Sequence, residues 1–217
     1  MAIISRDCET SESLTLKIFR SGAFMQKFAG LIIFLVLFSA ACVSVAELPE
    51  RVKIQGPLPQ SVQSVVVRPT AMNPGAIKNV EGLTDAPKYF SRSLKTALEG
   101  KQPGWQVRLA DEQGAMPDGD IAVATELINI DGGSAGLRFW IGFSAGAAES
   151  LVNATILDKA GKELASAKIS ARTMCPIGAC VESNEDTVRR NLNSLAGEVA
   201  EFTLNPAEYD KKKGSGS

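Results

Sequence analysis

Residues 151–172 read LVNATILDKAGKELASAKISAR, and this stretch decides the fold. Two β-rich arms, 151–157 and 164–172, flank Asp-Lys-Ala-Gly at positions 158–161, which is typical of a tight hairpin with glycine in a left-handed conformation. In the second arm the odd-numbered residues from 165 to 171 are Ala, Ala, Ile and Ala, whereas their even-numbered neighbours are Ser, Lys, Ser and Arg. This alternation predicts a strand with one buried face and one face in water.

The rest of the chain supplies three more strands and two helices. β-rich runs at 62–68, 105–109 and 120–130 predict strands, and Pro69 ends the first of them. Two segments with apolar residues at helical spacing predict helices, 84–100 and 183–204. The order of strand, helix, strands, hairpin and helix predicts an α+β fold: a mixed β-sheet of about five strands with two helices packed on one face.

The amino-terminal part has the pattern of an export signal. Residues 25–41 begin with Met-Gln-Lys-Phe, continue through an apolar run and end in small residues, as a signal peptide does, and the run is short for a membrane span. We expect Met25 to be the natural start and residues 1–24 to be an upstream extension. The expected organisation after the signal is a linker, one α+β domain and a tail that ends in a Gly-Ser linker, at 42–60, 61–206 and 207–217.

Two processing sites compete at the end of this signal. Small residues directly before Cys42 resemble a bacterial lipobox, in which the cysteine receives a lipid, although Ser39 stands where the pattern prefers an aliphatic residue. The rival site is Ser-Val-Ala at 44–46, which suits the ordinary signal peptidase, and an uncleaved anchor is a third possibility. We expect lipidation of Cys42 and a periplasmic protein held on the outer membrane, since Val43 is not the aspartate typical of inner-membrane retention.

Two further cysteines, Cys175 and Cys180, lie close together in the exported domain. Nearby cysteines in an oxidising compartment normally pair, so we expect a structural disulfide between them. A redox or metal site is the alternative. The spacing is not Cys-x-x-Cys, and the chain has no histidine to complete a zinc site.

Composition argues against several classes of function. The chain contains no histidine, which removes the commonest general base and metal ligand, and its net charge of −1 provides no basic field for nucleic acid. We therefore expect no enzyme activity, no catalytic residues, no cofactor, no metal and no nucleic-acid partner. The expected partners are an envelope protein or a second copy of this chain, together with the membrane that receives the amino-terminal lipid.

The most unusual segment is 132–146, which reads GGSAGLRFWIGFSAG. Its glycines do not match a nucleotide-binding loop. One interpretation is an exposed patch that binds a partner or lies against lipid, formed by Arg138, Phe139, Trp140 and Phe143. The other is that the aromatic side chains point into the core from a bulged strand, with glycines where backbones approach closely.

These features together resemble a known family. The glycine-rich start of 136–173, the Ala-Gly-Ala step at 145–147 and the hairpin at 158–161 resemble the bacterial lipoprotein family called domain of unknown function 4410, over about residues 60–204. The resemblance implies an α/β sandwich similar to the amino-terminal domain of TolB and to the periplasmic domain of curli-secretion lipoproteins. It carries over no catalytic residues. The imperfect lipobox and the Cys175–Cys180 loop depart from the family pattern.

Three functions remain open on this basis. The leading hypothesis is a non-catalytic periplasmic lipoprotein that binds or scaffolds components of a cell-envelope assembly. The second is a subunit of an oligomeric outer-membrane secretion channel, in which 132–147 forms the inserted hairpin. The third is a periplasmic hydrolase that uses the acids near the glycine-rich segment, Glu126, Asp131 and Glu149.

Overall fold

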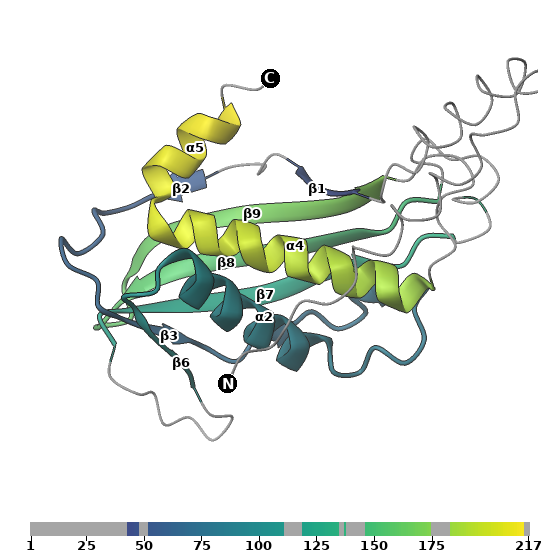
Figure 1. Ribbon diagram of the computed structural model, residues 1–217, viewed down its shortest axis with the longest axis horizontal. Helices are drawn as coiled ribbons and strands as arrows, with labels where there is room; N and C mark the ends of the chain where they lie inside the picture. Colours follow the sequence, from purple (N-terminus) through teal and green to yellow (C-terminus); the bar gives the residue numbers. More distant parts are fainter. Residues whose placement is uncertain are drawn as a thin grey trace, which may run out of the picture. The chain divides into compact units, whose positions relative to one another are not determined.

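A computed structural model of the chain describes residues 43–47, 52–110, 119–134, 137, 146–174 and 183–214. Within these ranges nine strands form one mixed sheet, and three helices accompany it. The main order of the strands across the sheet is β1-β9-β8-β7-β3-β6 (Figure 1). The predicted α+β class is therefore confirmed. The predicted numbers of about five strands and two helices were too low.

Three long antiparallel strands form the centre of the sheet: β7 (Ile121–Asp131), β8 (Glu149–Asp158) and β9 (Glu163–Met174). The hairpin between β8 and β9 forms as its sequence predicts. The Asp158 Oδ1 atom accepts hydrogen bonds from the backbone N–H groups of Ala160 and Lys162, at 2.9 and 2.8 Å. Gly161 takes a φ of +81°, which favours glycine because a Cβ atom is strained there.

A parallel unit lies on one side of β7. The strand β3 (Ser64–Val67) runs parallel to both β7 and β6 (Gln106–Leu109), and α2 (Ala86–Lys101) connects β3 to β6. After Pro69 the chain keeps following β7 through two short strands that the sequence did not predict, β4 (Ala71–Met72) and β5 (Ile77–Lys78). Proline ends the regular pairing because it has no N–H group to donate.

The opposite edge of the sheet is built from the segment expected to be a linker. Two strands of that segment pair antiparallel with β9, namely β1 (Val43–Glu47) and β2 (Val52–Ile54). The first residue of β1, Val43, pairs with Met174, the last residue of β9. The segment 42–60 therefore contributes two strands to the sheet.

The helices α2 and α4 (Asn184–Leu204) lie side by side over one face of the sheet (Figure 1). Ser183 caps α4: its Oγ atom accepts a hydrogen bond from the Asp186 N–H group at 3.0 Å, as the capping pattern predicts. Apolar side chains of both helices and of the covered sheet face form one buried core. Each fully buried Leu, Ile or Phe side chain contributes about 1.5–3 kcal/mol.

A third helix, α5 (Pro206–Gly214), follows α4 in the segment expected to be a tail. The Tyr209 ring packs edge-on against Phe202 with 5.8 Å between the ring centroids, and its hydroxyl donates to Glu198 Oε2 at 3.0 Å. Pro206 thus ends one helix and starts the next, because proline suits the first turn of a helix. None of the described helices is long and apolar enough to cross a membrane.

Candidate functional site

The seven residues that the sequence singles out lie outside the described residues: Cys42, Arg138, Phe139, Trp140, Phe143, Cys175 and Cys180. The structure places the ends of the chain segments that carry them. Cys42 directly precedes β1, and Cys175 directly follows β9. The lipidation, the disulfide and the aromatic patch therefore stay predictions. The structure gives only the strands that adjoin these residues in the sequence.

The two ends of the glycine-rich segment meet at the end of the sheet. The Ser134 N–H group donates to the Gly146 carbonyl at 3.0 Å, between the end of β7 and the start of β8. Gly133 has a φ of +63°, and a Cβ atom there would lie 2.2 Å from the Gly146 carbonyl oxygen. A Cβ atom at Gly132 would lie 2.6 Å from the Asn79 carbonyl oxygen. These glycines mark close approaches between backbone segments.

The three acids of the hydrolase hypothesis do not converge. Asp131 and Glu149 lie opposite each other in register, but Glu126 lies five residues earlier on β7, about 16 Å away at the usual rise of a strand. The Asp131 Oδ1 atom accepts hydrogen bonds from the Asn79 side chain and the Gly133 backbone, both at 2.8 Å. Asp131 thus holds the loop at the end of β7, and Glu126 lies on a different part of the sheet.

The face of the sheet away from α2 and α4 carries a groove of about 660 Å³. Four charged residues line it, two of each sign: Lys53, Glu126, Glu163 and Lys168. Between them lie short side chains such as Thr155 and Ser166, which are neighbours in register on β8 and β9. Asn153 Nδ2 donates to Glu126 Oε2 at 3.3 Å. The groove is open, and its described charged residues balance one another, so it suits contact with another surface better than enclosure of a small ligand.

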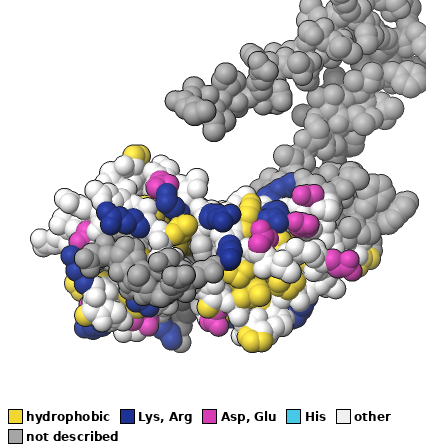
Figure 2. All heavy atoms as spheres, turned by 90° about the horizontal axis from the view of Figure 1, so that it is seen from below, with side chains coloured by type: hydrophobic (Ala, Val, Ile, Leu, Met, Phe, Trp, Pro, Cys, Tyr) yellow, Lys and Arg dark blue, Asp and Glu magenta, His cyan; other side chains and the backbone are white. Residues whose placement is uncertain are grey.

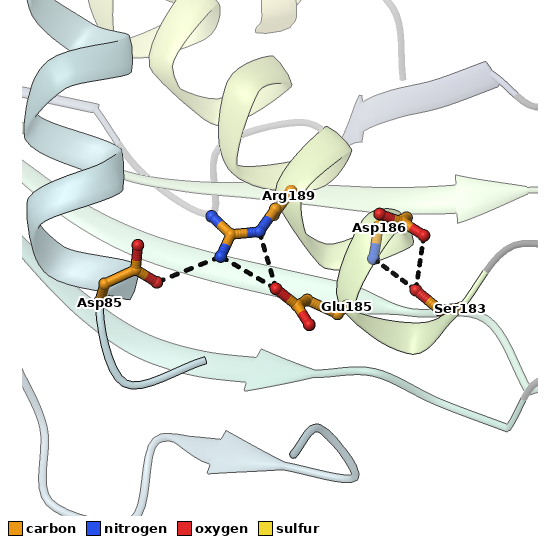
Figure 3. Close-up of polar contacts among 5 residues, drawn as sticks. All are labelled: Asp85, Ser183, Glu185, Asp186 and Arg189. Carbon is orange, nitrogen blue, oxygen red and sulfur yellow. Dashed lines mark hydrogen bonds and ion pairs between the residues drawn. The ribbon is translucent and has the colours of Figure 1, made fainter. Parts of the chain in front are cut away.

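A cluster of charged residues joins the starts of α2 and α4 (Figure 3). Arg189 Nη2 lies 2.9 Å from Glu185 Oε1 and 3.3 Å from Asp85 Oδ1, and its guanidinium group lies 4.8 Å from the centre of the Tyr89 ring. The hydrogen bond to Glu185 is the largest cause of a raised pKa of Arg189. The sequence carries no local signal of this cluster, because Asp85 and Arg189 are 104 residues apart. It connects the starts of the two helices.

No group of three side chains that could hold a metal ion occurs within the described ranges. The strongest electrostatic effect on a carboxyl group concerns Asp120, next to β3. Its Oδ2 atom accepts hydrogen bonds from the backbone of Gln63 and Ser64, both at 2.9 Å, and Lys159 lies 3.0 Å from Oδ1. These contacts, the Gln63 bond first, hold the pKa of Asp120 well below its usual range. Asp120 thus joins β3, the start of β7 and the β8–β9 hairpin.

A family model described as "Domain of unknown function (DUF4410)" matches residues 65–175. The chain belongs to the DUF4410 family. The match runs from β3 to the first cysteine of the Cys175–Cys180 pair, and it confirms the resemblance seen in the sequence. No curated protein is similar enough to this chain to count as a match.

A comparison with solved structures found matches of low similarity. The PelC dodecamer from Paraburkholderia phytofirmans is 13% identical, with 73% of this chain and 98% of that chain covered and a TM-score of 0.44. A DUF330 protein from Xanthomonas campestris is 16% identical, with 75% and 95% covered and a TM-score of 0.48. A protein described as a lipoprotein candidate from Caulobacter crescentus is 15% identical, with 64% and 91% covered and a TM-score of 0.29.

Proposed function

We propose that this chain is a non-catalytic periplasmic lipoprotein, anchored in the outer membrane through Cys42, that binds or scaffolds components of a cell-envelope assembly. The observation that carries the proposal is the junction between the anchor and the sheet. β1 begins at Val43, directly after Cys42, and Val43 pairs with Met174 of β9. A lipid on Cys42 would therefore be attached to the end of the sheet and not to a free linker, so that this end would face the membrane.

The aromatic segment leaves the sheet at the same end. Asp131, at the end of β7, pairs with Glu149 of β8, which in turn pairs with Arg172 of β9, two residues before Met174. Residues 132–148 therefore connect two strands at the end that would face the membrane. This placement supports a contact between a membrane-associated partner and the predicted patch, Arg138, Phe139, Trp140 and Phe143.

The absence of enzyme activity stays part of the proposal, and two observations support it. The chain has no histidine, and Glu126 lies far along β7 from Asp131 and Glu149. The groove on the open face presents fixed strands, short side chains and balanced charges. Such a surface is suited to binding.

The anchor can be tested with Cys42→Ala in the host cell. We expect this change to abolish palmitate labelling and to move the protein from the membrane fraction into the soluble periplasmic fraction. Cys175→Ala is the matched control, because it removes another thiol, which directly follows β9 in the sequence, and should leave labelling intact. Unchanged fractionation of the Cys42→Ala protein would contradict the lipoprotein proposal.

The predicted disulfide calls for peptide mapping under non-reducing conditions, with a Cys175–Cys180 bridge as the expected product. Cys42 and Cys175 flank the Val43–Met174 pair in the sequence, so the mapping should also search for a bridge between those two. A Cys42–Cys175 bridge would exclude a lipid on the same thiol and would contradict the proposed anchor.

The partner can be sought by in-cell photocrosslinking from Trp140 and Phe143. We expect discrete adducts from these positions and none from Thr96, an exposed position on α2. Adducts with a different envelope protein would support a scaffold. Adducts with a second copy, together with ring-sized particles in light scattering in detergent, would favour the rival function of a channel subunit.

A further inference from the structure

A second hollow, of about 330 Å³, lies where β3 and β6 end beside the first turns of α2. The residues that matter for its chemistry are Arg68 and Thr70, which follow β3, and Lys88, Ser91 and Arg92 of α2. No described residue lines both this hollow and the groove on the open face. Its volume is that of a small-molecule site.

The hollow lies where the chain reverses its direction across the sheet, between the β3–β6 connection and the β6–β7 connection. From β3 the chain passes through α2, which packs on the covered face of the sheet, and returns as β6 on one side of β3. From β6 it goes to β7 on the other side of β3, and it arrives there at Gly119, where a Cβ atom would lie 2.7 Å from the Val66 side chain. Val66 belongs to the small cluster on the opposite face. The order of the strands thus reverses at β3, and in open sheets with parallel strands ligands bind outside the carboxyl ends at such a point.

Among the described residues, the charged side chains that line the hollow are all positive. Arg68, Lys88 and Arg92 line it, and no Asp or Glu does so among the described residues. The Arg68 Nε atom is buried and has no hydrogen-bond partner within the described part of the chain. Asp85, at the start of α2, pairs with Arg189 (Figure 3). Viewed from below the orientation of Figure 1, Lys and Arg side chains lie across the middle of the surface, with Asp and Glu side chains among them (Figure 2).

The hydroxyl groups beside these cations are occupied with one another. Ser91 Oγ donates to the Pro87 carbonyl at 3.0 Å, so it accepts from Thr70 Oγ1 at 2.7 Å, and Thr70 Oγ1 accepts in turn from Thr125 Oγ1 at 2.9 Å. This chain of hydrogen bonds connects α2 to β7 through Thr70. It fixes the position of the wall beside the cationic side chains of Arg68, Lys88 and Arg92.

We propose that this hollow binds a phosphate-bearing anion. A phosphate monoester carries nearly two negative charges at neutral pH and several acceptor oxygens, which matches two guanidinium groups and one ammonium group around a small cavity. The shared chemistry fits either a soluble phosphate or the phosphate of a lipid headgroup. The site does not depend on the proposed anchor or on the aromatic segment, so either proposal can fail alone.

Isothermal titration calorimetry on the purified full chain, at low ionic strength, tests the site with inorganic phosphate and with glycerol 3-phosphate. We expect saturable binding to a single site. The double variant Lys88→Gln/Arg92→Gln should bind phosphate at least about tenfold more weakly, since each removed cation gives up a charge-assisted hydrogen bond. Both side chains are exposed, so the variant should fold.

Lys78→Gln/Lys211→Gln is the control, because it removes the same charge from two exposed positions outside the hollow and should bind like the wild type. Tighter binding of glycerol 3-phosphate than of inorganic phosphate would indicate that the site binds the phosphate of a lipid headgroup. Equal binding would indicate that it binds a soluble phosphate. Absence of saturable binding, or equal weakening in the two double variants, would overturn the proposal.

Discussion

The two faces of the central sheet differ although they are built by the same strands. On β8 the covered face carries Val152, Ala154 and Ile156, all fully buried beneath the helices, whereas the open face carries Asn153 and Thr155 in a groove. Successive residues of a strand point to opposite faces, so one short sequence supplies both. The covered face therefore provides stability, and the open face can vary with little effect on the fold.

The largest predicted effect is on the covered face. Phe90→Ala should lower the free energy of unfolding by about 3–5 kcal/mol, because it leaves a cavity under α2 where the Phe90 side chain is fully buried. Urea denaturation followed by circular dichroism measures the change. Thr96→Ala, at an exposed position on the same helix, should change it by less than about 0.5 kcal/mol. Equal effects of the two substitutions would contradict the assignment of stability to the covered face.

A smaller effect is expected at a buried polar position on that face. Asn191 of α4 accepts a hydrogen bond from Thr173 Oγ1 at 2.6 Å and donates to the Ala148 carbonyl at 3.1 Å. Asn191→Leu removes both bonds and should cost about 1–3 kcal/mol of unfolding free energy. Adding Thr173→Val should restore part of the loss, because the hydroxyl partner is then gone as well. A purely additive double-mutant cycle would show that the two side chains do not interact.

Low pH should weaken the contribution of Asp120 to stability. This residue joins β3 to the β8–β9 hairpin at one end of the sheet. Its pKa is lower in the folded chain than in the unfolded chain, so its contribution is complete above the unfolded value of about 4 and is lost as the pH falls toward the folded value. Asp120→Asn should therefore be less stable than the wild type at pH 7, and the difference should shrink below pH 4. Urea midpoints at several pH values measure it, and a constant difference would contradict this role.

The smallest effect is predicted on the open face. Thr155→Ala and Ser166→Ala should each change the unfolding free energy by less than about 0.5 kcal/mol, because both side chains lie in the groove with partial exposure. If the groove binds a partner, the same substitutions should instead weaken recovery of crosslinked complexes. A large loss of stability from either one would show that the open face also carries packing energy.

The sequence predicted the parts of the fold whose pattern is local. The alternation in 164–172, the apolar run in 120–130 and the capping box before α4 each carry their signal within about ten residues. The short strands β1, β2, β4 and β5 were missed. Each has two to five residues, and each is a strand only because β9 or β7 lies beside it.

The candidate sites also differ in whether the sequence alone indicates them. The sequence drew attention to cysteines and to an aromatic run, since these stand out one residue at a time. It did not indicate the cationic hollow, because Arg68, Lys88 and Arg92 are separated by up to 24 residues and are ordinary surface types when taken singly. Only the turn after β3 and the packing of α2 bring them to one cavity.

The amino-acid sequence by itself determined the family, the α+β class and the strand faces, because hydrophobic periodicity and turn chemistry act between near neighbours. Tertiary structure decided that 42–60 contributes strands to the sheet edge, that the glycines at 132, 133 and 146 mark close approaches of the backbone, and that three cations share one hollow. Those outcomes depend on contacts between residues far apart in the chain, and such contacts exist only once the sheet has formed.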